Sequence, residues 1–126
     1  MEDKRLSVLK SMNEHYDQLY KRVHYLFVGH GAGLVGCLTV LKDYGSTPQY
    51  RGVGLPIVLF GIGLVAAIVN YITLAFSQMV AKDTVLGGPV REPSMTVFWI
   101  HYGAMAISII AFIVALVIIV GHAASL

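Results

Sequence analysis

The chain has 126 residues, of which 56% are hydrophobic and 13% are charged, and its formal net charge is +2. A soluble domain typically carries about 25% charged residues, so this composition argues against an ordinary soluble globular protein. The small net charge gives no sign of a nucleic-acid partner, and the single cysteine, Cys37, has no second cysteine in the chain to pair with. We therefore expect an all-α integral membrane protein whose main partner is the lipid bilayer.

Residues 1–22 are predicted to form an amphipathic helix on the cytoplasmic side of the membrane. Lys10 with Glu14, and Asp17 with Lys21, are opposite charges at i,i+4 spacing, which favours a helix. A heptad-like apolar seam runs without a glycine or proline into the next segment through Leu9, Met12, Tyr16, Leu19, Val23 and Leu26. This seam indicates either self-association or a helix that lies on the membrane surface.

Three long apolar segments, 23–41, 55–76 and 96–121, contain no Asp, Glu, Lys or Arg and are predicted to be transmembrane helices. The hydrocarbon core of a bilayer is about 30 Å thick, so a spanning helix needs roughly 20 apolar residues. An outer loop is expected at 42–54 and a cytoplasmic loop at 77–95, both rich in glycine and proline. Ser94 or Thr96 is a candidate N-cap for the third span. One membrane domain, 1–126, accounts for the whole chain.

Basic residues are distributed unevenly about the predicted spans. The N-terminal segment and the loop 77–95 would share one side of the membrane, and they hold Lys4, Arg5, Lys10, Lys21, Arg22, Lys82 and Arg91. The loop 42–54 holds only Lys42 and Arg51. Because basic residues near span ends favour the cytoplasm, we expect a cell (inner) membrane protein with its N-terminus in the cytoplasm and its C-terminus outside.

Each predicted span has small residues at i,i+4 spacing, a pattern that lets helix backbones approach closely in a membrane. The pairs are Gly29/Gly33 and Ala32/Gly36 in the first span, Gly63/Ala67 in the second, and Ala104/Ser108 and Ala111/Ala115 in the third. Three helices have more such faces than one bundle is expected to bury. The sequence therefore favours a homo-oligomer, the alternative being a tight three-helix monomer.

The polar residues inside the spans, His30, Asn70 and His101, are predicted to lie at one depth, about 8–12 Å from the cytoplasmic boundary. Intramembrane polar side chains usually face the bundle interior, so these three are expected to form a shared layer. One interpretation is a structural hydrogen-bond network, and a second is the lining of a proton or ion path. A third is a haem b site with His30 and His101 as axial ligands and nearby glycines making room. Apart from that alternative, no cofactor or metal is expected.

Motifs of soluble enzymes, such as a Walker loop, CxxC, HExxH and G-x-S-x-G, do not occur in the sequence. Ser108 and Thr73 have no base on an obviously matching face, so no catalytic residue is predicted and an enzyme is not expected. We expect a self-associating pore- or channel-like or membrane-permeabilising assembly, comparable in size to phage holins or membrane-acting effectors. The alternative is an accessory or haem-holding anchor subunit that binds other membrane subunits of a larger complex.

The charge asymmetry gives a testable topology. A reporter fused after Leu126 is expected to report an extracytoplasmic location, because seven basic residues lie on the predicted cytoplasmic side and two on the other. Paired fusions of alkaline phosphatase and green fluorescent protein measure this directly. A C-terminal fusion that fluoresces in the cytoplasm and lacks phosphatase activity contradicts the predicted orientation.

Overall fold

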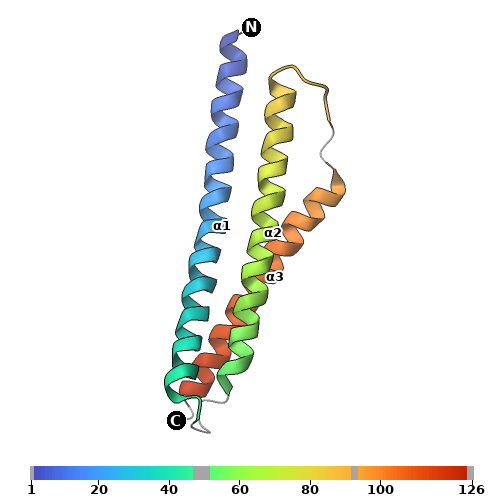
Figure 1. The fold of residues 1–126 in the computed structure, drawn as a ribbon. Helices are drawn as coiled ribbons and strands as arrows, with labels where there is room; N and C mark the ends of the chain where they lie inside the picture. Colours follow the sequence, from blue (N-terminus) through green and yellow to red (C-terminus); the bar gives the residue numbers. More distant parts are fainter. Residues whose placement is uncertain (1, 47–51, 92–93, 125–126) are drawn as a thin grey trace.

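The computed structural model describes residues 2–46, 52–91 and 94–124, most of which lie in three long helices (Figure 1). The helices are α1 (Glu2–Tyr44), α2 (Gly54–Val85) and α3 (Met95–Ala123). All three are long and apolar enough to cross a membrane, so the chain is a multi-pass membrane protein of the all-helical class. Pro48, Tyr50 and Arg51 of the predicted outer loop, and Pro93 of the second loop, lie outside the described residues.

Helix α1 is one continuous helix of 43 residues, about 65 Å long at 1.5 Å per residue. The separate amphipathic helix predicted at residues 1–22 is not shown, since residues 2–22 are the first half of α1. The physical reason lies in the sequence: no glycine or proline interrupts the chain before Gly29, so no residue there ends the helix. Predicted span 23–41 is therefore the second half of a longer rod.

Helix α2 also continues beyond its predicted span, past residue 76 to Val85. It ends where Gly87 takes a positive φ of 101°, a conformation that glycine adopts without steric cost. The Gly87 N–H then donates to the Thr84 carbonyl at 3.2 Å, and the Gly88 N–H donates to the Asp83 carbonyl at 2.9 Å. These bonds satisfy carbonyl groups at the helix end.

Helix α3 begins after Ser94, which occupies the N-cap position with an extended backbone. The predicted capping bond does not form, because the Ser94 side chain makes no hydrogen bond to the first turn. The Ser94 carbonyl instead accepts the first helical bond from the Phe98 N–H at 3.1 Å.

Helix α2 packs against both other helices, whereas α1 and α3 meet over a short stretch only (Figure 1). The buried positions of α2 include Phe60, Gly63, Ala67, Asn70 and Leu74, which recur every three or four residues on one face. Those of α3 are all small: Ala104, Ser108, Ala111 and Ala115. Small residues on both sides allow α2 and α3 to approach closely, and α3 then crosses α2 and leans away from α1 at its N-terminal end (Figure 1).

Candidate functional site: a three-helix junction and a pocket at the membrane boundary

His30 lies where the three helices meet. Its side chain is fully buried, and its Nε2 atom lies 3.0 Å from the Ser108 hydroxyl oxygen and 3.1 Å from the Ser108 carbonyl oxygen. A carbonyl oxygen only accepts hydrogen bonds, so Nε2 carries the proton and donates. The Ser108 hydroxyl in turn donates to the Gly63 carbonyl at 3.1 Å. One polar chain therefore joins α1 to α3 and α3 to α2.

The shape of this junction depends on two glycines. A Cβ atom at Gly63 would overlap the His30 ring, and a Cβ at Gly33 would overlap the Phe60 ring. Gly29 is almost as tight, since a Cβ there would lie 3.0 Å from Phe112 Cε2. Helix α1 can therefore approach α2 this closely only with glycine at positions 33 and 63.

Aromatic rings enclose the imidazole. The ring centroid of His30 lies 5.9 Å from that of Phe60 and 5.3 Å from that of Phe112, both at edge-to-face angles. Phe60 and Phe112 also contact each other, with centroids 5.9 Å apart. Such contacts stabilise a fixed ring orientation. Aromatic side chains therefore fill the space around the imidazole at the junction.

His30 and Ser108 form a histidine–serine pair, which sequence reasoning missed because it found no base facing Ser108. The pair is not arranged for nucleophilic catalysis. A serine nucleophile needs an unprotonated imidazole nitrogen to accept its proton, whereas His30 donates from Nε2 and Ser108 donates to Gly63. Both side chains are also fully buried, so a substrate has no access to them.

Asn70 and His101 lie apart from the junction. Counting seven residues from Gly63 along α2 and from Ser108 along α3 places both about 10 Å closer to the N-terminal end of α1. Asn70 is fully buried, and neither of its amide atoms has a hydrogen-bond partner among the described residues. His101 is partly exposed. The predicted single layer is therefore divided into two levels, with His30 bonded to Ser108 rather than to Asn70 or His101.

The geometry does not fit the paired-histidine haem site. The Nε2 atom of His30 is bonded to Ser108, and Phe60 and Phe112 fill the space beside Gly33 and Gly29. His101 lies at the other level. Within the described part of the chain, no three His, Cys, Asp or Glu residues are grouped to hold a metal ion. His30 thus packs between the helices, whereas His101 lines the pocket described below.

A second link joins the N-terminal half of α1 to the extended end of α2. The Tyr20 hydroxyl donates to Gln78 Oε1 at 3.1 Å, and the Tyr20 ring lies 5.2 Å from the Tyr71 ring. Sequence reasoning missed this link because it placed residue 78 in a loop. These contacts connect the helical extension of α2 to α1.

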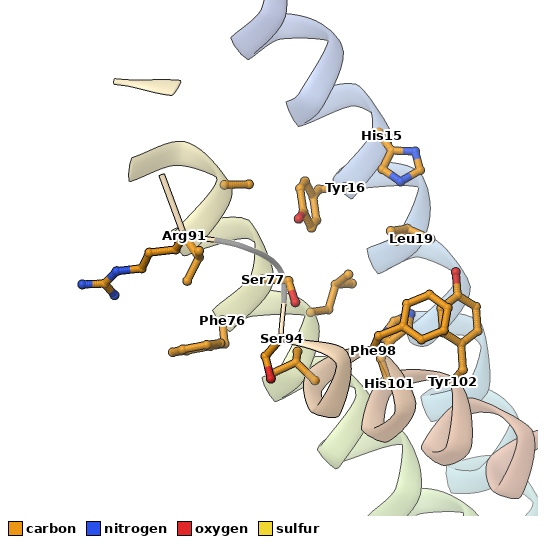
Figure 2. Close-up of a pocket in the computed structure, with 14 residues that line it drawn as sticks. His15, Tyr16, Leu19, Phe76, Ser77, Arg91, Ser94, Phe98, His101 and Tyr102 are labelled. Atoms are coloured by element: carbon orange, nitrogen blue, oxygen red, sulfur yellow. The ribbon is translucent and has the colours of Figure 1, made fainter. Parts of the chain in front are cut away.

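A cavity of about 490 Å³ lies between the N-terminal half of α1, the end of α2 and the start of α3 (Figure 2). Leu19, Leu74 and Val97 line its wall, one from each helix, at the level where the three predicted spans begin or end. The other lining residues are His15, Tyr16, Phe76, Ser77, Val80, Ala81, Arg91, Ser94, Phe98, His101 and Tyr102. The cavity exists because α3 leans away from α1 above the junction (Figure 1).

The lining of this pocket combines aromatic rings with hydrogen-bond donors. Tyr16 projects from α1 towards α2, and Phe98 and Tyr102 form the wall on α3 (Figure 2). Burial raises the pKa of the Tyr16 phenol, so it stays a neutral donor. Arg91 lies at the rim with its side chain directed outward (Figure 2). Among the described lining residues there are one arginine, two histidines and no Asp or Glu.

Substituting Gly63 by alanine tests the junction. The added methyl group meets the His30 ring, so we expect a loss of about 1–3 kcal/mol in stability and a lower melting temperature in detergent. Gly61→Ala, two residues away on α2, is the matched control because a Cβ there meets nothing within 4 Å. Equal melting temperatures for the two variants would show that His30 does not pack on α2 as described.

Comparison with protein-family models, curated protein sequences and solved structures finds no match to this chain.

Proposed function

We propose that this protein is a homo-oligomeric assembly of the cell membrane that opens a path across the bilayer between its copies. The observation that carries the proposal is a small-residue face on α1 that no helix of the same chain covers. Ala32 and Gly36 lie on it and are exposed, and a Cβ at Gly36 would meet nothing within 4 Å. The other small-residue pair of α1, Gly29 and Gly33, packs inside the bundle.

The exposed face is a continuous stripe along α1. Val28 and Val35 are 55% and 64% exposed, and Thr39 and Gly36 are exposed beside them, all at helical spacing. In lipid, apolar side chains alone do not drive helices to associate. Close contact between helix backbones, which small residues allow, does drive association. A second copy of α1 is therefore the partner that this stripe best accommodates.

The closed junction supports a path between copies and not within one. His30, Phe60 and Phe112 fill the centre of the three-helix bundle. In this proposal the conducting route therefore runs between copies, along surfaces that would face lipid if a copy were alone. In this proposal the N-terminus lies in the cytoplasm and the C-terminus outside, which is supported by the distribution of basic residues.

Disulfide trapping tests the interface. In a Cys37→Ala background, Ala32→Cys is expected to form disulfide-linked dimers in native membranes, because two α1 stripes would bring the introduced thiols together. Val117→Cys, on the 65% exposed lipid face of α3, is the control and should remain monomeric. Dimers from Val117→Cys in equal yield would point to random collision.

Liposome flux tests the path itself. The purified chain is expected to release a small entrapped dye or ion, and Gly36→Leu should reduce release at least tenfold because a branched side chain separates the helices. Gly121→Leu in the last turn of α3 is the control, since a Cβ at Gly121 also meets nothing within 4 Å. Verified oligomers without any flux would exclude the pore and favour an accessory subunit.

A further inference from the structure

The pocket between α1, α2 and α3 lies at the predicted edge of the hydrocarbon core. Leu19, Leu74 and Val97 are each eleven residues from the junction residues His30, Gly63 and Ser108, and all three line the pocket. Eleven helical residues correspond to about 16 Å, so these positions share one level above the junction. A molecule bound here would have one end in an aqueous environment and the other in an apolar one.

The size and walls of the pocket suit a single apolar chain. Its volume of about 490 Å³ is within the range of about 300–1,000 Å³ that is common for small-molecule sites. At about 30 Å³ for a water-sized group, it accommodates roughly 16 such groups. That is the size of one long acyl chain. Leu74, Val80 and Val97 provide apolar walls, and the Phe98 ring adds a flat surface.

The charge around the pocket suits an anionic head group. Arg91 lies at the rim, and no ion pair or hydrogen bond joins its guanidinium to another described residue. His15 of α1 and Ser94 before α3 are also exposed and line the pocket. The described lining residues include no Asp or Glu that would repel an anion. Arginine often binds a carboxylate or a phosphate with two parallel hydrogen bonds, so either anion is a suitable head group for a ligand at Arg91.

We propose that this pocket binds a single-chain anionic amphiphile, with its head group near Arg91 at the rim and its acyl chain against Leu74, Val80 and Val97. A carboxylate and a phosphate head group share this chemistry. The proposal is independent of pore formation, since it concerns one copy of the chain and a surface away from the exposed face of α1.

The test uses the full chain in nanodiscs of zwitterionic lipid and a long-chain fatty acid that carries a photoreactive diazirine. Labelling is expected to be saturable and to map to peptides containing residues 74–81 and 97–102. Ala81→Trp fills the pocket and should reduce labelling at least tenfold. Met79→Trp is the matched control on α2: this residue is 60% exposed and does not line the pocket, so labelling should stay within twofold of the parent chain.

Competition identifies the head group. Unlabelled fatty acid should displace the probe, whereas an amine with the same chain should not; Arg91→Gln should weaken binding several-fold without touching helix packing. Displacement by lysophosphatidate as well would identify phosphate as an accepted head, and displacement by fatty acid alone would restrict the site to carboxylates. If the melting profile of Ala81→Trp shows that this variant does not fold, the effect of Arg91→Gln and the competition experiments test the proposal instead. Unsaturable labelling spread over lipid-facing positions such as Val117, or equal displacement by the amine, overturns the proposal.

Discussion

The fold depends on one polar contact in an apolar environment: the Nε2–H group of His30 donating to Ser108. No water is present in lipid to replace a lost hydrogen bond. A buried imidazole therefore holds its helix in the position where it reaches a hydrogen-bond partner, which here is Ser108. Ser108 passes the constraint to α2 through the Gly63 carbonyl, and Gly63 leaves the space that the ring occupies. The contact thus fixes the rotation and the axial position of all three helices relative to one another. Hydrophobic packing alone would leave these helices free to slide, because lipid is as apolar as their side chains.

The fold class and the three apolar helices could be predicted from the sequence because long uncharged segments have few alternatives in a membrane. The helix ends could not be predicted equally well. A hydropathy pattern marks where the lipid ends, whereas a helix continues until a residue stops it. Helix α1 therefore extends through the charged residues 2–22, and α2 continues until Gly87 turns the chain. Contacts such as that between Tyr20 and Gln78 also support these extensions, and they join residues too far apart in sequence for a local pattern to reveal.

Sequence reasoning about the site found the residues and missed their partners. His30 and Asn70 were expected in the interior because polar groups avoid lipid, and both are fully buried. Their expected common level was based on counting from span boundaries, which carries an error of a helical turn or more. Because of that error, His101 was expected at the level of His30, whereas the residue that contacts His30 is Ser108. The pocket had no sequence signal of its own, because it arises from the angle at which α3 leaves α2, and crossing angles follow from side-chain packing along the whole interface.

The length of α1 gives the molecule a mechanical property. Within one unbroken helix, backbone hydrogen bonds couple each turn to the next, so the rod rotates or tilts as a unit. Residues 2–20 extend beyond the predicted membrane edge, while His30 in the same rod is held between α2 and α3. A force on the protruding end therefore meets the contacts of Tyr20 with Gln78 and Tyr71 before it reaches His30, so α1 is supported at two levels along its length.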